Sequence, residues 1–153
     1  MGYIPAPQDY ILQFRGITMA SRLCGRINNI ILGKMHAHVH ILWKEIPLSV
    51  IITRASCDDM HLNVGDAVTV IVRGTDVMLA KAFSGMLSAR NKAKGVVRNI
   101  IEGDVLSKIC VESQGDILHA YITNTSLKEL CLHEGDEVTA FVKSTELILS
   151  KDM

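Results

Sequence analysis

The stretch GVVRNIIEG at residues 95–103 repeats GRINNIILG at residues 25–33, seventy positions earlier in the chain. Outward from this match, residues 21–81 align with residues 91–151 without a gap, and 18 of the 61 aligned pairs are identical. One unit is therefore present twice, and Ser84-Gly85 between the copies has the composition of a turn. The repeat predicts a leader at 1–20, a first unit at 21–83 and a second unit at 88–153.

Each unit is expected to consist mainly of strands. In the second unit, alternating apolar residues separated by turn residues predict strands near 95–101, 105–112, 117–123, 137–143 and 146–150. One helical turn is expected at 126–130, since Ser126 and Glu129 have capping-box spacing. This pattern predicts an all-β chain of two tandem, small, OB-like five-stranded barrels, each with one short helix. Units this small have marginal cores, so pairing between copies or chains is expected.

The composition indicates a folded chain without a nucleic-acid-binding surface. Among 153 residues, 16 basic side chains balance 16 acidic ones, and 48% are hydrophobic. No stretch is apolar enough to cross a membrane, and Pro5, Pro7 and Asp9 stand where a signal peptide has its apolar run. A cytoplasmic protein is expected. Four widely spaced cysteines without a C-x-x-C pair predict buried, reduced thiols rather than a zinc ribbon or disulfide framework.

No arrangement of residues typical of an enzyme occurs, and Asp66 and Asp136, which follow glycines, are expected to stabilise turns. More informative is a set of hydrogen-bond donors and cations in the second unit: Ser88, Ala89, Arg90, Asn91, Thr123, Ser126, Lys143 and Ser144. Hydroxyls, cations and backbone N–H groups of this kind suit a dianion. The alternative is that Thr123 and Ser126 only cap the helix and that Arg90 and Lys143 are solvated surface charges.

The same stretches carry a family resemblance. The sequences SARN at 88–91, ITNTS at 122–126, LHEGDEVTA at 132–140 and VKST at 142–145 resemble the molybdate-binding Mop domain, the molbindin group of the TOBE family. The first unit is similar through GDAVT at 65–69 and ITRAS at 52–56. Tandem Mop units occur in di-domain molbindins and in the effector half of molybdate-responsive transcription regulators.

The resemblance implies a site for molybdate, with tungstate as an analogue, at interfaces between Mop units. Ser88 and Arg90 would supply donors from one unit, and Thr123, Ser126, Lys143 and Ser144 would line the other side, in the same chain or in a partner. It also implies a homo-oligomer, a dimer or a trimer, that stores molybdenum in the cytoplasm. The alternative is the ligand-sensing, dimerising half of a regulator without its DNA-binding half.

The first unit departs from this pattern. Ala20 stands opposite Arg90 in the alignment, with Arg22 two residues on, and Arg73-Gly74 replaces Lys143-Ser144. Weaker candidate ligands in this unit are Thr53, Ser56 and Arg73. Fewer competent sites are therefore expected than two intact copies would provide.

His36, His38 and His40 alternate on one predicted strand and share a face. Such imidazoles can bind a metal cation, but no Cys or carboxylate nearby in the sequence completes the coordination, so no cation site is predicted. The preferred interpretation is a polar outer face, with the core side formed by Met35, Ala37, Val39 and Ile41, and with Trp43 packing in the core or an interface. Binding of single-stranded nucleic acid ranks last among the functions considered, because aromatic residues are few.

Overall fold

The computed structural model describes residues 13–14, 17–18 and 20–152, so most of the predicted leader lies outside the described residues. Two short strands, β1 (Gln13–Phe14) and β2 (Ile17–Thr18), pair antiparallel ahead of the first unit. None of the helices in the described part of the chain has the length and apolar composition needed to cross a bilayer.

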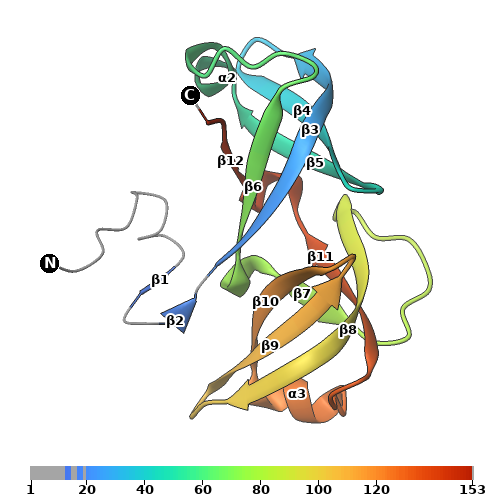
Figure 1. Ribbon diagram of the computed structural model, residues 1–153. Coiled ribbons are helices and arrows are strands. Elements are labelled where there is room, and N and C mark those ends of the chain that lie inside the picture. Colours follow the sequence, from blue (N-terminus) through green and yellow to red (C-terminus); the bar gives the residue numbers. More distant parts are fainter. Residues whose placement is uncertain (1–12, 15–16, 19, 153) are drawn as a thin grey trace, which may run out of the picture.

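Both units have the same order of elements (Figure 1). The first unit contains β3 (Ala20–Leu32), β4 (His36–Trp43), β5 (Ile46–Thr53), α2 (Arg54–Asp59), β6 (Ala67–Arg73), the 3₁₀ turn η1 (Gly74–Asp76) and β7 (Met78–Ala80). The second contains β8 (Asn91–Glu102), β9 (Leu106–Ser113), β10 (Asp116–Thr123), α3 (Asn124–Glu129), β11 (Glu137–Val142), η2 (Ser144–Glu146) and β12 (Ile148–Ser150). The all-β prediction of two curled five-stranded sheets is confirmed.

The two units exchange their last strands. One sheet has the order β12-β6-β3-β4-β5 and the other β10-β9-β8-β11-β7, so each repeat places its fifth strand in the sheet of the other repeat. In Figure 1 the dark red β12 lies beside the green β6. The lysine after each exchanged strand also binds the other unit: Lys81 pairs with Asp136 at 3.2 Å and Lys151 with Asp66 at 3.0 Å. The segments 21–83 and 88–153 therefore describe sequence repeats, and each sheet is built from both.

The repeated GxxxNIIxG motif explains how each sheet curls. A Cβ added at Gly25 would lie 2.7 Å from the Leu42 carbonyl oxygen, and one at Gly95 would lie 2.5 Å from that of Glu112. The neighbouring strand therefore passes too close for any side chain. Directly after each glycine the register shifts, in β3 between Ile27 and Asn29, and such a bulge bends the strand. The motif thus closes the barrel.

The helices begin two residues earlier than predicted. Helix α3 starts at Asn124 rather than at Ser126, because Thr123 is the N-cap: its backbone is extended, and its hydroxyl accepts a hydrogen bond from the Ser126 N–H at 3.1 Å. Helix α2 repeats this geometry with Thr53 and Ser56 at 3.0 Å. The predicted capping box is therefore wrong in its position, since a threonine three residues before the serine satisfies the same N–H.

A single core runs through both units. Trp43 is fully buried in it, and its indole N–H donates to Asp116 of the second unit at 2.6 Å, which confirms an interface role for this residue. Ala37, Val39 and Ile41 are buried as predicted. Met35 is 75% exposed, contrary to prediction, because β4 begins only at His36 and Met35 lies in the preceding turn.

The predicted turn role of the two aspartates is confirmed. Asp66 Oδ2 accepts from the Asn63 N–H, and Asp136 Oδ2 accepts from the His133 N–H, both at 2.8 Å. These bonds and the lysine partners lower the pKa of both carboxyl groups. All four cysteines are free, but Cys24 and Cys131 are exposed, so the prediction of buried thiols is wrong for these two, which lie on outer surfaces.

Candidate functional site

The second unit contacts the first where Asn91 meets Ser49. Ser49 lies in β5, the edge strand of its sheet, and its N–H donates to Asn91 Oδ1 at 2.6 Å. Asn91 Nδ2 donates to the Ser49 carbonyl at 2.8 Å and to the Val142 carbonyl at 3.1 Å. We call this contact, with Ser144, the Ser49 junction. The Asn91 side chain is therefore fully engaged within the protein.

The hydroxyl of Ser49 joins two further side chains. Ser49 Oγ lies 2.9 Å from Ser144 Oγ, and it also forms a hydrogen bond with His38 Nε2. Ser49 is buried, whereas Ser144 and His38 are half-buried. A chain of hydrogen bonds therefore runs from β4 through the edge strand to the start of η2, where it meets the solvent.

Two cations flank the Ser49 junction. Asn91 is the Cα partner of Val142, so the preceding Arg90 and the following Lys143 stand opposite each other at the open end of the β8–β11 ladder. Both side chains are exposed, and neither makes an ion pair with any other residue that the structure describes. Ser88 is also exposed, while Ala89 is buried. Arg90, Lys143 and Ser144 thus form a donor cluster, which Ser88 and Ala89 precede in the chain.

Thr123 and Ser126 lie elsewhere. Thr123 pairs with Leu106, at the tip where β8 ends, whereas Asn91 is the first residue of β8. Eleven residues of strand separate these two ends, on the order of 35 Å along the chain. Thr123 and Ser126 border an open hollow of about 460 Å³ that contains none of the residues of the donor cluster. One unit alone therefore does not bring all its predicted ligands together.

The first unit brings its own caps closer to the donor cluster. Thr53 ends the same strand that carries Ser49, four residues further on. With Ser56 it lines an open hollow of about 460 Å³ that also includes Thr145, the residue after Ser144. Within one chain, the helix cap nearest to Lys143 and Ser144 is therefore the cap formed by Thr53 and Ser56 of the first unit.

The corresponding contact joins β3 of the first unit to β10 of the second, where Ser21 meets His119. We call it the Ser21 junction, and it is built differently. Among the described residues, the Ser21 hydroxyl has one hydrogen bond, which it accepts from the His119 N–H at 2.9 Å. Gly74 stands where the Ser49 junction has Ser144, and a Cβ there would lie 2.6 Å from the ring of Tyr121. The ring thus occupies the space that a serine side chain would need.

The cation at the Ser21 junction is already paired with carboxylates. Arg73, the counterpart of Lys143, pairs with Asp76 at 2.8 Å and with Glu146 at 3.5 Å. Ala20 is buried directly opposite Arg73. Burial lowers the pKa of His119 and raises that of Cys110, whose Sγ lies 3.5 Å from His119 Nδ1, so both groups are neutral near pH 7. This junction offers an anion little positive charge.

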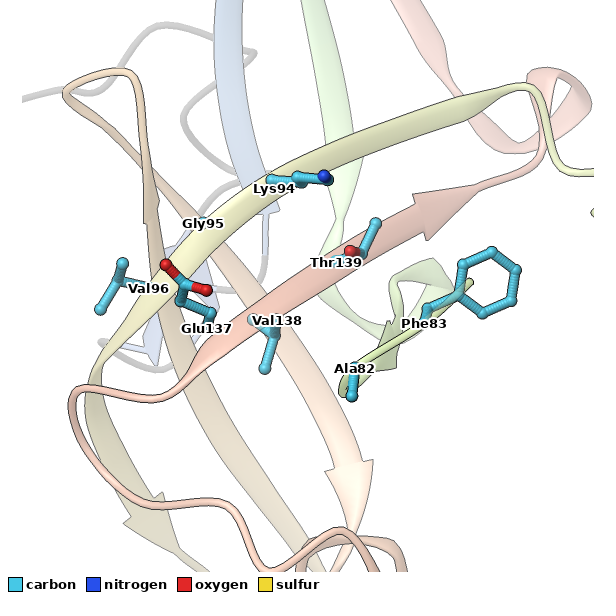
Figure 2. Close-up of a pocket in the computed structure, with 8 residues that line it drawn as sticks. All are labelled: Ala82, Phe83, Lys94, Gly95, Val96, Glu137, Val138 and Thr139. Atoms are coloured by element: carbon cyan, nitrogen blue, oxygen red, sulfur yellow. The ribbon is translucent and has the colours of Figure 1, made fainter. Parts of the chain in front are cut away.

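The pocket in Figure 2 is separate from both junctions. It has a volume of about 450 Å³ and lies over β8 and β11, beside the segment that follows β7. Its polar side chains are Lys94, Glu137 and Thr139, and none of the predicted ligands lines it. The carboxylate of Glu137 at its edge disfavours an anion.

The three histidines do not form a metal site. The rings of His38 and His40 stack with centroids 4.1 Å apart, and His36 is exposed at the start of β4. Across the described ranges, no group of three His, Cys, Asp or Glu side chains is arranged to hold a metal ion. The sequence did not predict that Ser49 and His38 belong to this junction. Their counterparts in the second unit are His119 and Lys108, so the repeat shows no common residue type at either position.

Comparison with known proteins gives consistent matches. The TOBE domain model matches residues 87–149. Molybdenum-pterin-binding protein 2 of Clostridium pasteurianum is 38% identical over 64 residues, which are 41% of this chain and 94% of that protein. The molybdenum transport protein ModE of Azotobacter vinelandii is 31% identical over 132 residues, which cover 85% of this chain. The chain spans about half of ModE, 49% of its length.

A solved structure is similar over most of the chain. The cytoplasmic molybdate-binding protein ModG, determined with molybdate bound, superposes with a TM-score of 0.83 at 28% sequence identity. The match covers 86% of this chain and 95% of that one. Both repeats and their mutual arrangement are therefore shared with this protein.

Proposed function

The chain belongs to the molbindin group of TOBE-domain proteins, and on that premise we propose that it binds molybdate at the Ser49 junction. The observation that carries the proposal is the pair of exposed cations, Arg90 and Lys143, that flank Ser144 without ion-pair partners among the described residues. Molybdate is a tetrahedral dianion that offers only acceptors. A site of guanidinium, ammonium, hydroxyl and backbone N–H groups matches it.

Selectivity follows from the same donor chemistry. The nearest carboxylate in η2, Glu146, is directed to Arg73 at 3.5 Å instead of to Lys143. A site made only of donors disfavours ligands that keep a proton, such as hydrogen phosphate. Sulfate is then rejected by its smaller size, and tungstate, with nearly the same size and charge as molybdate, binds equally well.

The site is completed by a helix cap, which makes assembly part of the function. Thr53 and Ser56 of the same chain, or Thr123 and Ser126 of a second copy, supply the remaining hydroxyls. Exposed apolar residues near both barrel tips support a homo-oligomer, a dimer or a trimer: Ile31, Leu32, Met35, Ile101, Val105 and Leu106. The Ser21 junction, which Tyr121 fills, contributes no equivalent site.

The role that fits this chemistry is binding rather than catalysis. We assign the chain to storage of molybdate in the cytoplasm, as its balanced charge and tandem units suit a carrier. The second candidate is the ligand-sensing and dimerising half of a regulator, which is favoured by the match of this chain to only 49% of the longer ModE protein. A change in oligomer size on addition of molybdate supports the second role, and an unchanged oligomer supports storage.

Calorimetric titration with molybdate in excess sulfate, with the mass of the assembly measured in parallel, tests the proposal. Saturable binding at micromolar affinity or tighter is expected, with fewer than two anions per chain. The double variant R90A/S126A should bind more weakly while its thermal unfolding stays unchanged. Absence of binding to the native chain, or an unaltered affinity in the double variant, would refute the assignment.

A further inference from the structure

A chain of two hydrogen bonds from His38 through Ser49 to Ser144 connects an imidazole with the proposed anion site. His38 Nε2 bonds Ser49 Oγ, and Ser49 Oγ lies 2.9 Å from Ser144 Oγ. The imidazole is therefore two hydroxyls away from the flanking cations Arg90 and Lys143. In the second unit, Lys108 and His119 stand at the positions of His38 and Ser49, so this chain of groups is particular to the Ser49 junction.

Each serine hydroxyl has one proton, and this sets the direction of the whole chain. When His38 Nε2 carries no proton, Ser49 must donate to it, and Ser49 can then only accept from Ser144. The single proton of Ser144 is consumed inside the protein. When Nε2 carries a proton, Ser49 accepts from His38 and donates to Ser144, so the Ser144 proton points outward.

We propose that His38 is a positioning residue for the oxyanion: the neutral ring carries its proton on Nδ1, and only the imidazolium donates from Nε2 to Ser49 and so leaves the Ser144 hydroxyl free to donate to the bound anion. This inference rests on the proposed function, since it takes Ser144 as a ligand. In this proposal the imidazole of His38 does not contact the anion, but it determines whether the Ser144 hydroxyl can donate to the anion.

Charged groups around His38 also influence whether its imidazole is protonated. On its own strand His40 stacks against it, and from the second unit Arg90 acts on it. The neighbouring strands place only Ile31 and Ile51 opposite it. Of the charged side chains of α2, Arg54 pairs with Asp58 at 3.3 Å, and Asp59 is exposed. In η2, Glu146 pairs with Arg73.

The sign of the pH effect follows from these neighbours. Partial burial and the charges of His40 and Arg90 lower the pKa of His38 in the free protein. A dianion beside Arg90 offsets that repulsion, so the pKa of His38 rises when the anion binds. Binding therefore takes up a proton, and affinity is highest below the free pKa and falls as the pH rises through the bound one.

Molybdate titrations between about pH 5.5 and 8.5 test the inference, in buffers with different ionisation enthalpies so that proton uptake is counted. We expect about tenfold tighter binding at the acid end, with net proton uptake. His38→Gln keeps a donor at the Nε2 position but does not titrate, so its affinity should be independent of pH. Ser49→Ala breaks the chain while keeping the backbone bonds to Asn91, and should reduce the slope to the part that the charge of His38 contributes alone.

His133→Gln is the control, because His133 is an exposed imidazole in the turn before β11, at the other end of that strand from Lys143, and it should keep the native slope. Tight binding that is independent of pH in the native chain, or a native slope in His38→Gln or Ser49→Ala, would overturn the role of His38 and leave the molybdate site standing. Absence of binding at every pH would overturn both.

Discussion

The carboxamide of Asn91 pairs with both outward backbone groups of Ser49, accepting from its N–H at 2.6 Å and donating to its carbonyl at 2.8 Å. Since β5 is an edge strand, this side chain takes the place of a neighbouring strand for one residue. The counterpart of Asn91 in the first unit, Ser21, makes only one such bond, to His119 at 2.9 Å. The two junctions therefore differ in strength.

Asn91→Ala should destabilise the fold by about 3 kcal/mol, because buried N–H and carbonyl groups of Ser49 lose their partner. Ser21→Ala is the matched control and should cost about 1 kcal/mol, since one bond is lost there. Urea denaturation of both variants measures the difference. Equal losses in the two variants would contradict the inequality of the junctions.

Gly74→Ser should destabilise by about 1–3 kcal/mol, because its Cβ would lie 2.6 Å from Tyr121 Cδ2. Adding Tyr121→Ile, which copies Ile51 at the corresponding position, removes the ring and should recover most of that loss. A double-mutant cycle by thermal unfolding gives the coupling between the two positions. If the two effects add without coupling, the ring does not fill the site as described.

Lys143→Ala should weaken molybdate binding by about tenfold, because the anion loses a charge-assisted donor. Arg73→Ala, its counterpart in the first unit, should leave the affinity within about twofold, since Arg73 already pairs with Asp76 and Glu146. Calorimetry on both variants decides the matter. A comparable loss in Arg73→Ala would place an anion at the Ser21 junction.

A chain that ends at Leu147 lacks β12 and should lose about 3 kcal/mol or more of stability, because the β6 edge is exposed and the buried Leu149 is removed. The destabilised sheet belongs to the first unit, although the deleted residues belong to the second. A chain that ends at Ser150 keeps β12 but loses the contacts of Lys151 with Asp66 and His61, and it serves as the control. Urea denaturation and light scattering report both effects; native stability in the shorter chain would argue against strand exchange.

The repeat and the alternation of apolar residues were sufficient to predict two small barrels of five strands. These signals are local: the period of two in β4 and the capping threonines act within a few residues, so each copy of the sequence specifies the same unit. The family resemblance also follows from the sequence, whereas the placement of Arg90 beside Lys143, instead of on the opposite side of the site, depends on the pairing of β8 with β11. The departures of the first unit from the pattern, at Ala20 and Gly74, were also visible in the sequence.

The tertiary structure alone decided which sheet receives each fifth strand. Met78 and Leu79 present the same apolar pattern to either edge, so periodicity does not distinguish β7 pairing with β6 from β7 pairing with β11. The same limit hid the contacts of Ser49, whose partners Asn91 and Ser144 lie 42 and 95 positions away, and with them the place of His38 in the junction. Contacts at such separations depend on how two sheets dock, which no spacing within one strand encodes.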